Sequence, residues 1–364
     1  MVDRSTTAQI STRIIKTMNF TLDRTGLVFT LKALLAASLS VYFVWFGSNI
    51  VFGHAYPQND QRMESARENL SQIQTDRFYR KQNLASALDS LEKERALLAF
   101  VGDIMLDRGV KESILKNGGG DFLFSFEKIQ ETLKQYNVLF GNLEGPISDK
   151  GQNQGSSYSF RMDPKTTSAL AFAGFNILSL ANNHIGDWGE EAAKDTTARL
   201  ESAGIIGVGM DYSPKILNLR GTKIAFLALS DIKGMVNLPF LYDKSEAEMA
   251  VRSAKEMSNL VIISMHFGEE YHKEPSVRQK EIAHGLIDAG ADLVIGSHPH
   301  VVQPVEQYKN SYIAYSLGNF VFDQDFSEDT MRGLLFEVEL ENGQIIKIAP
   351  KTVIINENFQ PTVP

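Results

Sequence analysis

The chain has 364 residues, a hydrophobic fraction of 43%, a formal net charge of -8 and no cysteine. Its length allows one large core or two ordinary ones, and its acidic balance argues against nucleic acid as a partner, because that binding depends on basic groups that neutralise phosphates. Without cysteine there are neither disulfides nor thiolate metal sites, so only oxygen and imidazole ligands are left for a metal ion.

The segment 33–53 is predicted to cross a membrane. Its 21 residues carry no formal charge, and a helix needs about 20 apolar residues to span a bilayer. Several basic residues precede the segment and a smaller number, Arg62 and Arg67, follow it closely. The positive-inside rule therefore predicts a cytoplasmic tail at 1–32 and an outward-facing remainder, with a single-pass anchor in the cell membrane. The alternative is a cleaved signal peptide, which the long apolar run and the long polar tail disfavour.

Residues 54–96 are polar and charged, and they follow the predicted anchor directly. Leu84, Leu88 and Leu91 within them are spaced to fall on one face of a helix. This pattern predicts a helical stalk that holds the next domain away from the membrane. The alternative is that two such helices pair through the short leucine stripe, as in a coiled coil.

From 97 to 364, apolar runs of strand length alternate with helical segments, which predicts one α/β domain. Gly174 and Gly290 each follow a helical segment, where glycine accepts the left-handed conformation that ends a helix. We expect a layered α/β sandwich that an antiparallel hairpin completes. The predicted elements include helices at 190–203 and 278–289, and hairpin strands at 333–340 and 345–355 joined through 341–343.

Polar side chains stand at the ends of six of these apolar runs. Because open parallel sheets place their ligand crevice outside the carboxyl ends of the strands, these side chains should converge although they are distant in sequence. Carboxylate, amide and imidazole groups that meet in one crevice favour a metal site. The residues at the run ends are Asp103, Glu144, Asn183 with His184, His266, His298 with His300, and Asn319.

Each of these residues also has an ordinary structural interpretation. Asp103 and Glu144 could be turn or helix-capping carboxylates, and a single buried histidine is more often a core residue than a ligand. The sequence His298-Pro299-His300 differs, because two imidazoles so close together at a strand end would be costly to bury without strong partners. The pair therefore favours the metal interpretation.

The order and spacing of these motifs resemble the CapA, or poly-γ-glutamate capsule biosynthesis, family, which is similar to the calcineurin-like metallophosphoesterases. The resemblance extends over about residues 97–325 and implies a metallophosphoesterase-like fold. The matching motifs are Val101-Gly102-Asp103-Ile104-Met105, Gly141-Asn142-Leu143-Glu144, Phe160-Arg161-Met162-Asp163-Pro164, Ala181-Asn182-Asn183-His184, His266-Phe267-Gly268-Glu269-Glu270-Tyr271, Gly296-Ser297-His298-Pro299-His300 and Tyr315-Ser316-Leu317-Gly318-Asn319-Phe320.

The resemblance implies a role for each matching residue. His184 would be left free of metal and would donate a proton to a leaving group. Two cations could activate a water and bind an oxyanion, and Mn, Fe or Zn would suit the ligands. The implied ligands of one or two divalent ions are Asp103, Glu144, Asn183, His266, His298 and His300.

Four further residues are assigned to substrate binding. Arg161 has a planar guanidinium that can bind carboxylate or phosphate with two hydrogen bonds; the alternative is a surface salt bridge. Glu270 and Tyr271 would either line the substrate path or orient His266. Asn319 lies in the last matching motif.

One position departs from the metallophosphoesterase pattern. Those enzymes usually carry histidine two residues after the first aspartate, whereas Met105 stands there in this chain. The first metal would then lack one imidazole, so a single or weakly bound ion could instead polarise an amide or ester carbonyl of a polymer.

These observations predict a membrane-anchored, outward-facing, metal-dependent protein that acts in synthesis, attachment or export of an extracellular capsule polymer. The resemblance implies poly-γ-glutamate, an anionic polymer, and subunits of a polymer synthase as partners. Two alternatives remain open: a non-catalytic scaffold of such a synthase, and a generic extracytoplasmic metallophosphoesterase. Metal content separates the enzymes from a metal-free scaffold.

Overall fold

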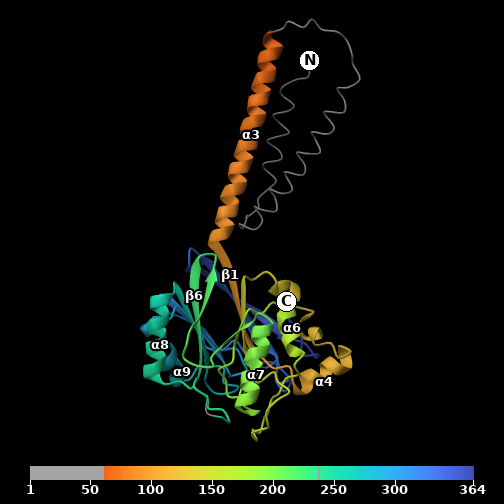
Figure 1. Cartoon of the computed structure of the whole chain (residues 1–364), viewed down its shortest axis with the longest axis vertical. Helices are drawn as coiled ribbons and strands as arrows, with labels where there is room; N and C mark the ends of the chain where they lie inside the picture. The colour runs from red at the N-terminus through yellow and green to blue at the C-terminus, as the bar shows by residue number, and fades with distance from the viewer. Residues whose placement is uncertain (1–60, 237) are drawn as a thin grey trace. The chain divides into compact units, whose positions relative to one another are not determined.

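The computed structural model describes residues 61–236 and 238–364 (Figure 1). The predicted tail at 1–32 and the predicted anchor at 33–53 lie outside the described residues. Within the described part, no helix is both long enough and apolar enough to span a bilayer. Within the described part, residues up to 81 and residues 82–364 belong to separate units.

Helix α3 (Gln61–Glu94) occupies most of the segment for which a stalk is predicted. Apolar side chains along it are about half exposed, among them Leu70, Ile73 and Phe78. Leu70 and Ile73 share one face, whereas Phe78 points elsewhere, because successive helical residues are rotated by 100°. The helix ends where the first strand of the domain begins. Its role as a stalk stays a prediction.

The first sheet of the domain has eight strands and is mixed. Four strands in its centre and at one edge run parallel, three continue the sheet as antiparallel neighbours, and β11 pairs in parallel with the end of β1. The strands, in sheet order, are β14 (Pro361–Thr362), β13 (Gln344–Ile355), β12 (Arg332–Glu341), β1 (Arg95–Ile104), β2 (Val138–Leu143), β3 (Ile177–Ser179) and β4 (Ile206–Val208), with β11 (Asn319–Val321) beside β1.

The second sheet has six strands, of which the inner four are parallel. Both edge strands, β5 and β9, are antiparallel to their neighbours. In sheet order the strands are β5 (Lys215–Leu219), β6 (Thr222–Ser230), β7 (Leu260–His266), β8 (Leu293–Ser297), β10 (Ser311–Ala314) and β9 (Val305–Tyr308).

The two sheets pack against each other through an apolar core. Alternate side chains of β6 face opposite ways, as the pleat requires. Phe226 joins the core shared with the first sheet and stacks on Phe140 of β2 at 6.1 Å between ring centroids. Leu227 instead joins a second cluster with helices α8 (Lys244–Met257) and α9 (Val277–Ala289). Burial on both faces explains why the inner strands are continuously apolar.

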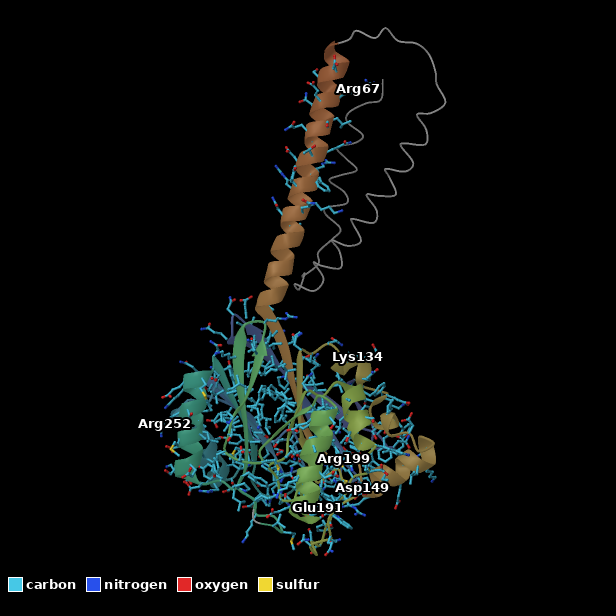
Figure 2. All side chains as sticks on the ribbon, in the orientation of Figure 1. Arg67, Lys134, Asp149, Glu191, Arg199 and Arg252 are labelled. Carbon is cyan, nitrogen blue, oxygen red and sulfur yellow. The ribbon has the colours of Figure 1, made fainter. Side chains whose placement is uncertain are left out.

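The other helices pack on the first sheet and its loops. Figure 1 shows α4 and α6 on the opposite side of the domain from α8 and α9, with α7 near the middle of the view. Buried residues of α7 include Ala192 and Leu200, while charged residues lie on its outer face. Figure 2 marks Arg199 beside Asp149, and the two form an ion pair of 2.6 Å. These elements are α4 (Arg108–Asn117), η1 (Phe122–Phe126), α5 (Gln130–Leu133), α6 (Thr166–Ala173) and α7 (Gly189–Ser202).

The expectation of a mixed, layered α/β fold is confirmed. Helices α7 and α9 and strands β12 and β13 lie within a residue of their predicted bounds at nearly every end. Gly174 ends α6 with φ 94°, and Asn342 and Gly343 form the hairpin turn with φ 52° and 76°. Two features were not predicted: the strands that carry the candidate site belong to two sheets, and β6 lies inside one of them.

Candidate metal centre

The predicted site residues come from the carboxyl ends of strands in both sheets. Asp103 lies near the end of β1, Glu144 follows β2, and Asn183 and His184 follow β3. In the second sheet His266 is the last residue of β7. His298 and His300 follow β8 directly. The structure brings all seven side chains into one network of close contacts.

Close approach of backbones fixes two of these strand ends. A Cβ on Gly102 would lie 1.8 Å from the carbonyl oxygen of Gly318, and one on Gly296 would lie 1.9 Å from that of Tyr315. No side chain fits at either place, so both positions require glycine. Gly102 directly precedes Asp103, and the same contact aligns Asp103 with Asn319 in the pairing of β1 and β11.

Asp103, Glu144 and His300 form the acidic half of the centre. Both carboxylates are fully buried. His300 Nδ1 lies 3.2 Å from Asp103 Oδ2, and His300 Nε2 lies 3.6 Å from Glu144 Oε1. Asn142 donates from Nδ2 to Asp103 Oδ1 at 2.8 Å and to Glu144 Oε2 at 3.3 Å. These three ligand atoms are close enough to hold one metal ion.

The electrostatics of this half call for positive charge. Burial raises the pKa of Glu144 well above its ordinary value, and the neighbouring Asp103 carboxylate raises it further. Burial acts to lower the pKa of His300, but the carboxylates of Glu144 and Asp103 outweigh it and raise the pKa to about 9. Without a cation, protons must therefore neutralise the cluster at neutral pH.

Asn183, His266 and His298 form the imidazole half. Asn183 Oδ1 and His266 Nε2 are 2.7 Å apart, and Ser297 Oγ lies 3.0 Å from His266 Nδ1. The rings of His266 and His298 have centroids 4.7 Å apart. Burial, and next the neighbouring His298, lower the pKa of His266; burial and His300 lower that of His298 to about 3. Both rings are therefore neutral at neutral pH, which is the form that binds metals.

Two buried atoms of the centre have no hydrogen-bond partner among the described residues: Glu144 Oε1 and His298 Nδ1. Unpaired buried polar atoms are uncommon and costly, but they are expected where an ion is to be bound. The backbone is strained at the same place, because His298 has φ 97° and His300 has φ 58°. Such conformations cost about 1–3 kcal/mol each and concentrate at functional sites. The donor set thus fits a divalent cation.

His184 lies beside the acidic half, and a buried carboxylate orients it. Its Nδ1 is 2.8 Å from Asp187 Oδ2, and its Nε2 is 3.9 Å from Glu144 Oε1. Phe160 packs on the imidazole with centroids 4.2 Å apart, and its backbone amide donates to Asp187 Oδ2 at 2.9 Å. Asn182 Oδ1 accepts from the His184 amide at 3.1 Å, which fixes the turn.

Sequence reasoning missed three residues of this network: Asn142, Asn182 and Asp187. All three are buried. Asp187 comes three residues after His184 in the same loop, and this spacing is the one signal in the sequence that could have suggested the pair. Asn142 and Asn182 were part of the matching motifs, but nothing local distinguishes an amide that links ligands from a turn residue.

The four residues assigned to substrate binding have different surroundings. Arg161 stacks over the ring of Trp188 at 3.6 Å and forms no ion pair within the described residues. Asn319 is buried and behind His300: its Oδ1 is 3.0 Å from His300 Nδ1, and its Nδ2 donates to Gln324 and to Thr330. Asn319 therefore orients His300, a predicted ligand, and its contact with a substrate stays a prediction.

Glu270 and Tyr271 lie at the exposed side of the centre. The Glu270 carboxylate, His298 and His300 have ligand atoms within 4.8 Å of one another. Tyr271 is 44% exposed, and its ring centroid is 6.2 Å from that of His300. Its hydroxyl accepts from Gln324 Nε2 at 3.2 Å. These contacts place both residues beside His298 and His300.

Residues 97–324 match the family model described as "Bacterial capsule synthesis protein PGA_cap". The chain belongs to this family of bacterial capsule synthesis proteins. It is 34% identical to the capsule biosynthesis protein CapA of Bacillus anthracis, over 72% of this chain and 68% of that one. It is 33% identical to the PGA biosynthesis protein CapA of Bacillus subtilis, over 63% and 64%. The chain thus spans about two thirds of the length of these two family members.

More distant members and solved structures are also similar. A probable polyglutamine synthesis accessory protein of Mycobacterium tuberculosis is 29% identical over 52% of this chain and 56% of that protein. Among solved structures, a phosphatase from Mycoplasma pneumoniae is 15% identical, with a TM-score of 0.45 over 71% of this chain and 94% of that one. The family membership rests on the sequence matches.

Proposed function

We propose that this family member is a metal-dependent enzyme that acts on an extracellular capsule polymer or its precursor. The proposal rests on one cluster with two parts. The first is the set of buried donors Asp103, Glu144 and His300, and the second, beside it, is the His184–Asp187 pair. A scaffold would need neither an oriented histidine nor unpaired buried donors next to it.

Donors from both halves of the centre would hold the metal. Asp103, Glu144 and His300 would bind in the acidic half, and Asn183, His266 and His298 in the imidazole half. A divalent ion such as Mn, Fe or Zn supplies Lewis-acid polarisation of a carbonyl or phosphoryl oxygen when it is bound. Burial of both carboxylates keeps water away, which strengthens electrostatic interactions within the site.

His184 is the proposed general acid. Asp187 accepts a hydrogen bond from Nδ1, so that the proton to be transferred sits on Nε2, which faces Glu144. Phe160 covers one face of the ring and limits its rotation. A histidine held in this way can protonate a leaving group at the centre.

The substrate is proposed to be an anionic polymer or its precursor. Arg161 supports this, because its guanidinium stacks on Trp188 and leaves its donors unpaired with any acid in the described structure. A stacked guanidinium binds carboxylate or phosphate with little further ordering. The names of the relatives, which refer to capsule, PGA and polyglutamine synthesis, suggest a glutamate polymer and subunits of a polymer synthase as partners.

The decisive experiment substitutes His184 in the full-length protein, purified in detergent, and in cells that depend on it for surface polymer. We expect His184→Gln to reduce polymer formation about 100-fold or more, the range of general acid catalysis, with unchanged metal content. His284→Gln is the matched control, since this histidine pairs with the carboxylate of Glu306 at 3.0 Å and packs on Tyr308, outside the centre.

Three other outcomes would redirect the proposal. Normal polymer formation by a metal-loaded His184→Gln protein would reject the catalytic role of this histidine. A wild-type protein that binds no metal would favour a scaffold subunit of a synthase. Metal-stimulated turnover of aryl phosphate esters with no effect on polymer would favour a generic phosphoesterase.

We further propose that residues 33–53 anchor the chain with the domain outside the cell. The sequence supports this through an uncharged run of 21 residues and the excess of basic residues before it. The chain has no cysteine, so single cysteines report their location cleanly. An impermeant maleimide should label Glu131→Cys in intact cells and Ser5→Cys only after lysis; the opposite pattern would reject this topology. Glu131 suits the label because its side chain is 85% exposed.

A further inference from the structure

One carboxylate near the centre belongs to neither half. Glu270 lies four residues after the end of β7, in an exposed turn, whereas Asp103 and Glu144 are fully buried. Its carboxylate oxygen and the ring nitrogens of His298 and His300 lie within 4.8 Å of one another. A group of two imidazoles and a carboxylate with that spacing can share one cation.

The backbone holds Glu270 in this place. The amide of Tyr271 donates to the carbonyl of Pro299 at 2.8 Å, and Pro299 stands between the two histidines. The turn that carries Glu270 is therefore fixed to the loop that carries His298 and His300. Tyr271 adopts φ 65°, a conformation that is unfavourable for a bulky residue and persists only when its surroundings enforce it.

Side-chain contacts hold the same turn on its other side. Gln303 donates from Nε2 to the carbonyl of His272 at 2.8 Å, just beyond the turn. The Tyr271 hydroxyl accepts from Gln324, whose own oxygen accepts from Asn319. Asn319 in turn contacts His300, so a chain of hydrogen bonds joins the Glu270 turn to a proposed ligand. Glu270 thus occupies a position that the structure specifies, although it is exposed.

A buried atom beside Glu270 independently points to a bound ion. His298 is only 7% exposed, and its Nδ1 has no hydrogen-bond partner within the described residues. The end of β1 offers no further donor, because the sulfur of the buried Met105 already accepts from the Asp107 amide at 3.1 Å. Within the two candidate ligand groups of the described residues, Glu270 is exposed and the other members are buried, so Glu270 can close the centre toward solvent.

We infer that Glu270 is a further metal ligand, which closes the proposed metal centre from the solvent side together with His298 and His300. The inference rests on the proposed function, since it assumes that the centre binds a divalent ion. It assigns to Glu270 a different task from substrate binding or orientation of His266. It also adds a third carboxylate to the centre, which favours divalent cations that accept oxygen ligands, such as Mn²⁺.

The test measures metal binding rather than activity. Full-length protein is stripped of metal, purified in detergent and titrated with Mn²⁺ by calorimetry, and with Co²⁺ by its visible absorption, which reports the ligands. We expect Glu270→Gln to weaken binding of one ion at least 10-fold and to change the Co²⁺ spectrum. Glu270→Asp, which keeps the carboxylate on a shorter side chain, should fall between Glu270→Gln and wild type.

Glu269→Gln is the matched control. It removes the same charge from the neighbouring residue, whose side chain is 67% exposed and lies 3.6 Å from His272. If Glu269→Gln weakens Mn²⁺ binding as much as Glu270→Gln does, the effect is one of net charge and the inference is overturned. Equal affinity and spectra for wild type and Glu270→Gln would overturn it too.

These outcomes are distinct from failure of the proposed function. A wild-type protein that binds neither Mn²⁺ nor Co²⁺ would reject the metal centre itself and the inference with it. A wild type that binds them, beside an unaffected Glu270→Gln variant, would reject only the inference. Because Glu270 is exposed, the glutamine variant should fold normally, and equal melting temperatures of the metal-free proteins would show this.

Discussion

The two halves of the centre solve the problem of buried polarity in different ways. The acidic half buries two carboxylates against one histidine, and the pKa values of Glu144 and His300 are both raised, so that protons are retained. The imidazole half buries His266 and His298 with lowered pKa values, so that protons are given up. The acidic half therefore needs positive charge, from protons or from a cation, while the histidines of the other half are already in the neutral form that can bind a metal.

Substitutions in the two halves should therefore differ in their effects on metal affinity and on the stability of the metal-free protein. Removing a charge from the acidic half relieves repulsion in the metal-free protein but weakens an ion's binding. Removing an imidazole from the other half takes away a ligand without relieving any charge. A substitution in the acidic half should thus lower metal affinity without destabilising the metal-free protein, whereas one in the imidazole half should lower metal affinity without any gain in stability.

The largest effect is expected for Glu144→Gln. Glu144 Oε1 is buried, unpaired within the described residues, and close to both His184 and His300. We expect metal affinity to fall about 100-fold or more, beyond the 10–100-fold cost of changing a residue that only supports a ligand. The metal-free variant should be as stable as wild type or more so, because burial and the neighbouring Asp103 make the Glu144 carboxylate costly to ionise. Calorimetric titration and thermal melting measure the two effects.

A Glu144→Gln protein that binds metal normally would remove the acidic half from the centre. His298→Gln serves as the comparison in the imidazole half. It should weaken binding but should leave the melting temperature of the metal-free protein the same or lower, since no buried charge is removed. If both variants stabilise the metal-free protein, the distinction between the halves fails.

A smaller effect is expected from pH on the metal-free protein. His300, with a pKa of about 9 in the folded state against an ordinary 6.5, contributes stability that is complete below pH 6.5 and is lost as the pH rises through 9. His298, with a folded-state pKa of about 3, acts in the opposite sense. Its ring is buried in the neutral form, so the protein loses stability as the pH falls below 6.5. Stability should therefore decline on both sides, by on the order of 3 kcal/mol at the alkaline side.

Chemical unfolding from pH 5 to pH 9.5 measures this profile. Saturating Mn²⁺ should remove the alkaline decline, because the ion replaces the protons of the acidic half. Glu144→Gln should reduce the same decline, because the carboxylate is what raises the pKa of His300. An alkaline decline that neither Mn²⁺ nor this substitution alters would come from groups elsewhere in the chain.

The positions of the candidate site residues could be predicted from the sequence because each stands at a definite local boundary. His266 follows six apolar or small residues, and together these seven residues form β7. Asn342-Gly343 marks a hairpin turn by its chemistry alone, and the structure has positive φ at both residues. Such features depend on neighbours in the chain, and a single sequence contains them.

The arrangement in space was not predictable in the same way. The run of β6 is apolar and readily recognised, but which strands it pairs with depends on packing between distant segments. Strands β4 and β11 have three residues each, too few to show a period. Asp187 looks like a surface turn residue in the sequence, yet it is fully buried because His184 and the Phe160 amide both contact it.

The smallest effects should come from the residues that contact the proposed histidine ligands from outside the centre. Asn319 contacts Nδ1 of His300 at 3.0 Å, and Ser297 contacts Nδ1 of His266 at the same distance. Each fixes a ring so that its Nε2 atom points into the centre. Changing either residue to alanine should lower metal affinity about 10-fold. Titration with Mn²⁺ at pH 6.5 and pH 8.5 measures both variants.

The pH dependence should differ between the two, because His300 carries the proton that metal must displace and His266 does not. Asn319→Ala should weaken binding less at pH 6.5 than at pH 8.5, because loss of the Asn319 acceptor also lowers the pKa of His300 and so weakens the proton that competes with the ion. Ser297→Ala should weaken binding equally at both values, because burial already keeps His266 neutral. Asn319→Asp retains the acceptor oxygen and should bind better than Asn319→Ala. An equal loss for both alanine variants at both pH values would mean that protons do not compete with the ion, and the proposed division of the centre would not hold.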